Sequence, residues 1–132
     1  MDYTTILKEY KLKVTPQRLA IVEELHSHGH LNIDDLYALL QKKFPTISLA
    51  TIYKNIHAML DKIFLSEVKI PNEKSVYELV KEQHAHVICS NCQKIVDVHV
   101  DTSSLEKEAE SFSSFELNEI AVVFTGVCSD CK

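Results

Sequence analysis

The strongest constraint on this 132-residue chain is the placement of its four cysteines. They stand in two pairs, Cys89 with Cys92 and Cys128 with Cys131, and each pair encloses two residues. This spacing lets both sulfur atoms of a pair turn toward one ion, and two pairs complete a tetrahedral shell of four sulfurs, usually around zinc. Such a shell leaves no open coordination position, so we predict a structural rather than a catalytic zinc site.

Three other interpretations of the cysteines are a pair of disulfides, an iron–sulfur cluster and unrelated buried thiols. The first residues lack the apolar stretch of a secretion signal, and no apolar run approaches about 18 residues, so we expect a cytoplasmic protein without a membrane span. In that compartment, cysteines are more often metal ligands than disulfides. The 35 residues between the pairs have room for a helix and a strand, so the ion would tie the last strand back to the first turn of the C-terminal part.

The charge is distributed unevenly along the chain, whose formal net charge is −5. Residues 1–80 hold ten of the 14 Lys and Arg and ten of the 19 Asp and Glu, so the whole excess of acid lies in residues 81–132. The two parts are therefore expected to have different roles. A neutral N-terminal part does not by itself indicate nucleic-acid binding, so that case depends on where the basic residues stand.

Apolar periodicity and capping residues predict helices in the first part of the chain. Thr15, Asn32 and Ser48 are expected N-caps of helices that end near Gly29, Phe44 and Lys62, after a short first helix over residues 3–10. Strands are predicted over 65–70 and 75–80, with a turn at 71–74 between them. Helices followed by a two-stranded hairpin are the order of a winged helix-turn-helix.

The second part is predicted to mix strands with one helix. Strands are expected at 87–88, 95–100 and 116–127, and a charged helix at 103–112. In the last helix of the first part, we expect one buried face to carry the apolar residues Leu49, Ile52, Ile56, Met59, Leu60 and Ile63. The fold class is therefore α+β, with a winged-helix domain over 1–80, a hinge at 81–84 and a small α/β domain over 85–132.

A second cluster of potential metal ligands stands beside the first cysteine pair. His84 and His86 are two residues apart, so on a strand both imidazoles point to one face. Asp97 lies on the strand returning from the cysteines. Imidazole and carboxylate ligands suit Fe²⁺, Mn²⁺, Zn²⁺ or Co²⁺, so the sequence offers one sulfur site and one nitrogen–oxygen site. The histidines without a partner at ligand spacing, predicted to be ordinary polar residues, are His26, His28 and His57.

Four segments resemble the ferric uptake regulator (Fur) superfamily, and they span nearly the whole chain. The resemblance implies a winged-helix DNA reader, a C-terminal dimerisation domain, a homodimer on a palindromic operator, and repression when a regulatory metal is bound. It also adds His30 and Glu78 to His84, His86 and Asp97 as the regulatory ligands. The matching segments are residues 15–18 (TPQR), 48–55 (SLATIYKN), 84–92 (HAHVICSNC) and 126–131 (GVCSDC).

Within this superfamily, the residues favour the peroxide-responsive subgroup over iron-responsive or other metal-responsive members. Asp97 is typical of peroxide sensors, whereas Glu78 is typical of iron sensors. Many iron sensors have a third metal site that needs a histidine and an acidic residue flanking His84, but Gln83 and Ala85 stand there. The resemblance then implies regulatory Fe²⁺ or Mn²⁺, with peroxide oxidising His30 or His84 when iron is bound.

The helix predicted over residues 49–62 is the expected reader of the major groove. Thr51, Tyr53 and Lys54 lie on or beside its outward flank, and Lys54 and Arg18 are candidates for phosphate or base contacts. Lys74 in the predicted wing turn is a candidate for a contact with the adjacent phosphate backbone of the DNA.

Two further classes of function remain open from the residues alone. A His-X-His pair with a carboxylate also occurs in metal-dependent hydrolases, but the chain has only two glycines and no nucleophile elbow. A zinc-stapled interaction module would explain the cysteines but not the helical part. We therefore expect no catalysis, no small organic substrate and no membrane partner.

Overall fold

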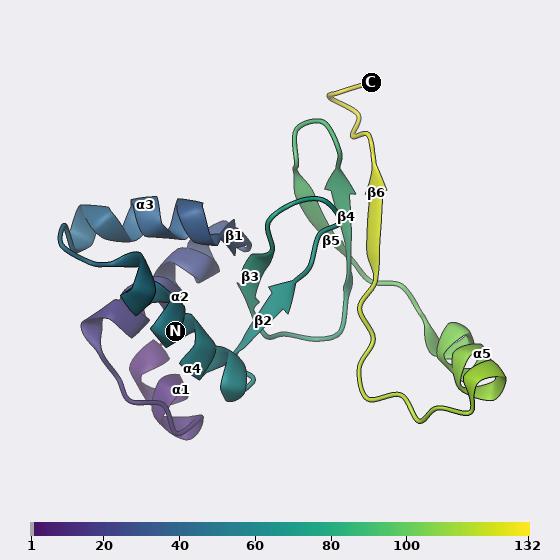
Figure 1. Ribbon diagram of the computed structural model, residues 1–132, viewed down its shortest axis with the longest axis horizontal. Coiled ribbons are helices and arrows are strands. Elements are labelled where there is room, and N and C mark those ends of the chain that lie inside the picture. Colours follow the sequence, from purple (N-terminus) through teal and green to yellow (C-terminus); the bar gives the residue numbers. More distant parts are fainter. Residues whose placement is uncertain (1) are drawn as a thin grey trace. The chain divides into compact units, whose positions relative to one another are not determined.

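The structure is a computed structural model that describes residues 2–132. The chain divides into two compact units between Lys81 and Glu82. A group of helices with a small sheet is followed by a second small sheet with one helix, which confirms the predicted α+β fold class (Figure 1). Among these described residues, no helix is both long enough and apolar enough to cross a membrane.

The N-terminal unit contains four helices and a small antiparallel sheet. Its helices are α1 (Tyr3–Glu9), α2 (Pro16–His28), α3 (Ile33–Lys43) and α4 (Leu49–Asp61). Its strands are β1 (Leu31–Asn32), β2 (Leu65–Val68) and β3 (Val76–Leu79), in the order β1-β3-β2. The hairpin of β2 and β3 is the predicted wing, and Asn72 in its turn has a left-handed φ of 63°.

Local capping chemistry explains where the longer helices begin. The side chains of Thr15, Asn32 and Ser48 accept hydrogen bonds from the backbone N–H groups three residues later, as predicted. Gly29 ends α2 with a φ of 79°, a conformation that favours glycine. The predicted boundaries of these helices are therefore confirmed to within a residue or two.

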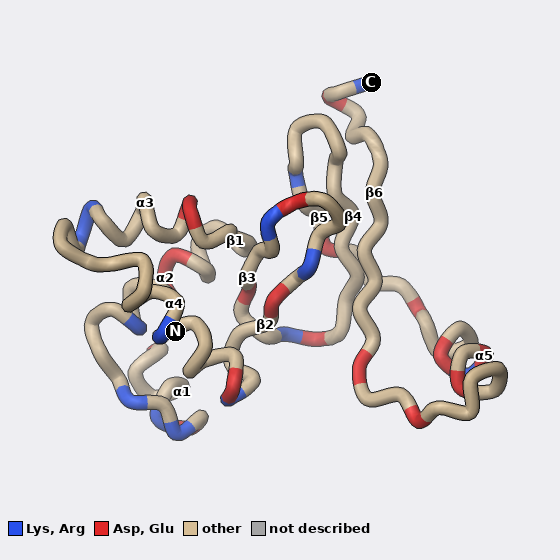
Figure 2. Tube along the Cα trace, in the orientation of Figure 1, with Lys and Arg blue, Asp and Glu red and all other residues tan. Residues whose placement is uncertain are grey.

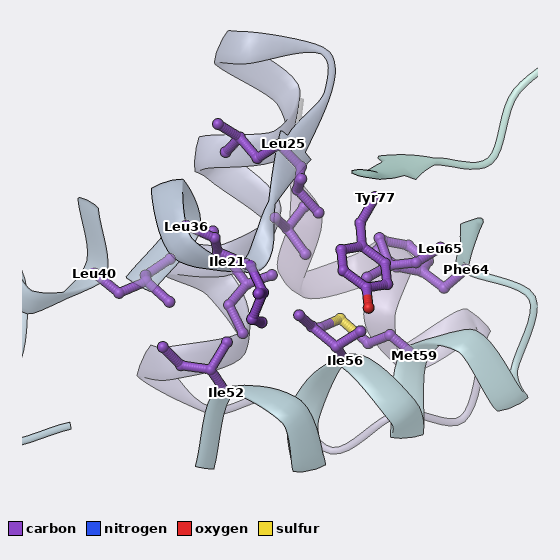
Figure 3. Close-up of a cluster of buried hydrophobic side chains, with 14 of the residues drawn as sticks. Ile21, Leu25, Leu36, Leu40, Ile52, Ile56, Met59, Phe64, Leu65 and Tyr77 are labelled. Carbon is purple, nitrogen blue, oxygen red and sulfur yellow. The ribbon is translucent and has the colours of Figure 1, made fainter. Parts of the chain in front are cut away.

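The core of the N-terminal unit is made by its helices α1 to α4 together with strands β1, β2 and β3. The side chains of α2, α3 and α4 point toward one another in Figure 3, with Tyr77 of β3 among them. Ile52, Ile56 and Met59 of α4 are fully buried. Their spacing of three and four residues places them on one face of the helix, which is the face that packs against α2 and α3.

Two residues expected on this buried face are exposed instead. Leu49 is 37% exposed and lines an open hollow beside Tyr53 and Tyr77. Ile63 is 70% exposed, because α4 ends at Asp61 and Ile63 has a left-handed φ of 58°, so the helical period no longer determines its direction. Asn55, which was not predicted to be inside, is buried at 9% exposure.

The C-terminal unit is a three-stranded sheet with one helix. It contains β4 (Ala85–Cys89), β5 (Ile95–Val98), α5 (Ser103–Ser113) and β6 (Val123–Gly126). The order is β5-β4-β6, with β5 antiparallel and β6 parallel to β4. The predicted strand over 116–127 is wrong in its first part, because the register with β4 begins only at Val123, just after the Val122 carbonyl oxygen that accepts from the His86 N–H.

Burial differs sharply between the units. Within residues 82–132, the buried apolar side chains are only Ala85, Ile88 and Cys89. Acidic residues gather along α5, as Figure 2 shows, which agrees with the acidic excess of this part of the sequence. Its large apolar side chains with more than a third of their area exposed are Val96, Val100, Leu105, Phe112, Phe115, Leu117, Phe124 and Val127.

The core packing predicts the effect of truncating a buried α4 side chain. Ile56→Ala leaves a cavity where the side chain was fully buried, so the free energy of unfolding of the N-terminal unit should fall by about 2–5 kcal/mol. His57→Ala, at the exposed neighbouring position, should change it by less than about 0.5 kcal/mol. Urea denaturation followed by helical circular dichroism measures both. Equal effects of the two substitutions would contradict this account of the core.

Candidate metal centres and nucleic-acid interface

The four cysteine sulfurs come together at one end of the C-terminal sheet. Cys89 ends β4, and Cys128 and Cys131 follow β6, whose Gly126 is the register partner of Cys89. The four sulfur atoms lie within 4.8 Å of one another, and the Cys92 and Cys128 sulfurs are 3.7 Å apart. In a tetrahedral zinc site with bonds of about 2.3 Å, the sulfurs are about 3.8 Å apart. The arrangement of the four cysteine sulfurs therefore matches that of a structural zinc site.

Backbone hydrogen bonds already favour a thiolate at Cys89. The N–H groups of Cys128 and Cys92 both approach the Cys89 sulfur at 3.4 Å. Donation from Cys128, then from Cys92 and Asn91, lowers the pKa of Cys89 to about 6. At Cys131, a contact with the Asn91 side chain lowers the pKa, but hydrogen bonds with the other cysteines and burial outweigh it and raise the pKa to about 11. Thiols that share protons in this way release them when a metal ion binds.

His30 and Glu78 form a close pair within the N-terminal unit. Leu31 of β1 is the register partner of Tyr77 of β3, and continuing this antiparallel register brings His30 opposite Glu78. The His30 Nε2 and Glu78 Oε2 atoms are 2.9 Å apart. The two-residue strand β1 was not predicted, and its pairing explains why a histidine at the end of α2 meets a carboxylate on the wing.

His84, His86 and Asp97 form a second cluster, within the C-terminal unit. His86 and Asp97 are register partners on β4 and β5, with Nε2 and Oδ1 3.5 Å apart. The His84 Nε2 atom lies 3.0 Å from that of His86 and 3.7 Å from Asp97 Oδ1. Two nitrogens bound at about 2.1 Å at right angles around one ion are about 3.0 Å apart. These three residues therefore fit the coordination of one divalent ion.

The other nitrogen of His84 is engaged with the backbone. His84 Nδ1 lies 2.7 Å from the carbonyl oxygen of Glu82, to which its N–H donates. This hydrogen bond puts the ring proton on Nδ1, so Nε2 keeps its lone pair for a metal. The rings of His84 and His86 meet edge to face, with centroids 4.5 Å apart. The backbone thus orients the ring before any ion binds.

The candidate DNA-reading residues lie along α4. Tyr53 and Lys54 are exposed, and the Tyr53 ring stacks on His57 at a centroid distance of 6.3 Å. The Thr51 hydroxyl lies 2.9 Å from the hydroxyl of the N-cap Ser48. Tyr53 and Lys54 are therefore open to a ligand, whereas Thr51 also has a local partner.

Two of the other predicted basic contacts have partners within the N-terminal unit. The Lys74 ammonium of the wing turn forms an ion pair with Asp34 in the first turn of α3. The Arg18 guanidinium donates to the Asn55 side chain and to the Lys13 carbonyl oxygen. Asn55 was missed by sequence reasoning. The available signal was a polar residue within the buried period of Ile52, Ile56 and Met59.

The histidines predicted to be ordinary polar residues make local contacts. His26 contacts the Tyr3 hydroxyl, and His28 lies 3.0 Å from the Glu24 carbonyl oxygen one turn before it.

Comparison with known proteins identifies the family. A model of the ferric uptake regulator family matches residues 9–125. The peroxide operon regulator of Bacillus subtilis is 36% identical over 128 residues, which cover 96% of this chain and 88% of the relative. The chain therefore belongs to the ferric uptake regulator family, whose members are transcriptional regulators that bind DNA and act as dimers.

Solved structures of this family share the fold. The Campylobacter jejuni peroxide stress regulator is 33% identical with a TM-score of 0.73, covering 99% of this chain and 100% of its own. The Vibrio cholerae ferric uptake regulator is 28% identical with a TM-score of 0.78, covering 96% of this chain and 100% of its own. The resemblance drawn from the sequence is thereby confirmed.

The four-cysteine site predicts that a cysteine variant loses its zinc. Cys131→Ser removes one thiolate ligand, so the protein should lose most of its zinc, and residues 82–132 should become sensitive to protease. Ser129→Ala, two residues away within the same turn, should keep about one zinc ion per chain. Metal analysis and limited proteolysis measure these outcomes. A Cys131→Ser protein with full zinc content and unchanged protease resistance would contradict the four-sulfur site.

Proposed function

We propose that this protein is a metal-dependent, DNA-binding repressor that senses peroxide through a regulatory Fe²⁺ or Mn²⁺ site. The observation that carries the proposal is a set of five nitrogen and oxygen ligands divided by the Lys81–Glu82 junction. His30 and Glu78 form a pair before it, and His84, His86 and Asp97 form a cluster after it. One ion that takes ligands from both units would connect them through the metal.

Such an ion would act as a switch through the geometry of the two units. Binding favours the arrangement in which all five ligands reach the ion, and operator DNA favours one arrangement of its reading helices. The two affinities are then coupled, because each ligand stabilises the same state. Without the ion, the carboxylates of Glu78 and Asp97 would repel each other in that arrangement, which favours opening.

We assign the two metals separate duties on the basis of their ligands. Thiolates hold Zn²⁺ in a closed shell, whereas imidazole and carboxylate groups suit Fe²⁺ and Mn²⁺. The four cysteines hold the structural zinc. They lie at the end of β4, in the turn that follows it and after β6, apart in sequence from His30 and Glu78. Removal of the regulatory ion should therefore leave the zinc in position.

DNA recognition is assigned to α4 in the major groove of a palindromic operator. Thr51, Tyr53 and Lys54 are the proposed base and phosphate contacts, with Lys74 of the wing on the adjacent backbone. Lys74 would exchange its ion pair with Asp34 for a phosphate, at little cost because both side chains are more than half exposed.

A homodimer in the cytoplasm is the proposed working form. Residues 82–132 expose eight large apolar side chains while burying three. A second copy of this unit would remove that apolar surface from water, which is a strong driving force for association. The two-fold axis of the dimer would match a palindromic operator.

Peroxide sensing is favoured by Asp97 and by similarity to the Bacillus subtilis peroxide operon regulator and the Campylobacter jejuni peroxide stress regulator. Bound Fe²⁺ would supply the activation of H₂O₂, and the imidazole ring of His30 or His84 would supply the two electrons that reduce it. One oxygen atom of the peroxide would enter that ring, and the other would leave as water. Regulation by iron or another metal without peroxide is the second candidate, and Glu78 favours it. We propose no enzymatic activity and no organic substrate.

Metal gating predicts the behaviour of a ligand variant. With His86→Ala, the increase in operator affinity on adding Mn²⁺ should fall at least about tenfold, because the switch loses a ligand from the β4 side. Zinc content should be unchanged. His28→Ala, an exposed histidine that contacts Glu24, is the matched control and should behave like wild type. Fluorescence anisotropy with and without Mn²⁺ makes the comparison, and an equal response of both variants would refute metal gating.

Peroxide sensing predicts a covalent signature. Treatment of the iron-loaded protein with H₂O₂ should add the mass of one oxygen atom to a peptide that contains His30 or His84, and operator DNA should be released. The manganese-loaded protein should show neither change, because Mn²⁺ does not activate peroxide in this way. Peptide mass spectrometry is the measurement. An iron-loaded protein that keeps its operator and its mass under peroxide would favour the metal-sensor alternative.

A further inference from the structure

Arg18 reaches from the start of α2 to the middle of α4. Its Nε–H donates to the Asn55 Oδ1 atom at 2.9 Å, and its Nη1 donates to the Lys13 carbonyl oxygen at 3.0 Å. The guanidinium is a planar fork with fixed donor directions, so these two bonds fix the orientation of the group. Arg18 is partly buried, in contrast to the exposed Lys54 on α4.

Asn55 completes the connection within α4. It is 9% exposed, and its Nδ2 donates to the Thr51 carbonyl oxygen at 3.0 Å. One end of the amide thus accepts from Arg18, and the other end holds the helical turn that carries Tyr53 and Lys54. Substitution of Arg18 would leave the buried Asn55 acceptor without this donor, which is unfavourable in a low-dielectric interior.

We propose that Arg18 and Asn55 form a clamp that sets the position of α4, and that Arg18 acts on DNA recognition through this clamp and not by contacting DNA. The proposal rests on the proposed DNA-binding function. It assigns Arg18 and Asn55 as positioning residues, whereas Tyr53 and Lys54 touch the duplex. A side chain that orients a reading helix affects sequence-specific binding most, because base contacts depend on geometry more than phosphate contacts do.

Salt dependence distinguishes a clamp from a phosphate contact. Each lost phosphate contact reduces the slope of log affinity against log salt by roughly one per protomer. Lysine replaces arginine as a phosphate-binding charge but cannot donate in the same fork to both Asn55 and Lys13. Arg18→Met and Arg18→Lys therefore separate the two roles. Asn55→Leu removes the hydrogen-bond acceptor while keeping a side chain of similar volume. Lys54→Met is the control for a residue that contacts DNA directly.

The experiment measures binding by the whole 132-residue chain loaded with zinc and Mn²⁺. The probes are a duplex selected by the wild type from a random-sequence pool and an unrelated duplex, each at several salt concentrations. Arg18→Met, Arg18→Lys and Asn55→Leu should each weaken binding to the selected duplex about tenfold. Their salt slope and their affinity for the unrelated duplex should stay at wild-type values. Combining Arg18→Met with Asn55→Leu should add little to either change alone, because both break one interaction.

Several outcomes would overturn the proposal. Rescue by Arg18→Lys, or a reduced salt slope in Arg18→Met like that of Lys54→Met, would identify Arg18 as a phosphate contact. Wild-type binding by Asn55→Leu would refute the clamp while leaving the DNA-binding function intact. An equal loss of affinity for both duplexes would indicate that the variant is unfolded, and not that α4 is mispositioned. Failure of the wild type to select any duplex would overturn both the clamp and the proposed function.

Discussion

The C-terminal unit depends on the binding of one metal ion by its four cysteines. Residues 82–132 bury only three apolar side chains, too few to offset the conformational entropy of ordering the segment. The four cysteines supply the missing constraint, because an ion between them joins the end of β4 to the segment after β6. Since β4 also carries His86 and pairs with the strand of Asp97, the same constraint holds these two potential ligands in register.

The chemistry of the two ligand sets explains why one small protein would use two metals. A closed thiolate shell is suited to permanent occupancy, and it leaves no position for a reactant. The proposed nitrogen and oxygen ligands are harder and would come from two units, so the ion that they would bind could leave and change the arrangement of those units. The His30–Glu78 pair and the His84–His86–Asp97 cluster each have suitable distances within their own unit.

The features that were predictable from the sequence are mainly local. Thr15, Asn32 and Ser48 cap their helices because each side chain bonds a backbone group three residues away. The cysteine pairs and the His84–His86 pair were recognisable because spacing alone determines where such neighbouring side chains point. The residues that bring chemistry together along one strand or one turn were therefore found without the structure.

The features that escaped prediction depend on distant pairing. Strand β1 has two residues and forms only by pairing with β3. Without this strand, nothing in the local sequence brings His30 close to Glu78. Only the family resemblance indicated that these two residues belong to one site. The residues from 116 to 121 alternate like a strand, but the register with β4 begins only at Val123. Ile63 follows the helical period yet lies beyond the end of α4. Asn55 is buried, and its side chain accepts a hydrogen bond from Arg18 of another helix.

The most direct test of two metals with separate duties is metal analysis of the wild type after dialysis against a mild chelator, combined with operator binding. The account predicts that about one zinc ion per chain remains, that the second metal is removed, and that operator affinity falls and returns when Mn²⁺ alone is added. If zinc left together with the second metal, or if operator affinity were the same with and without the second metal, the separation of structural and regulatory metals would be contradicted.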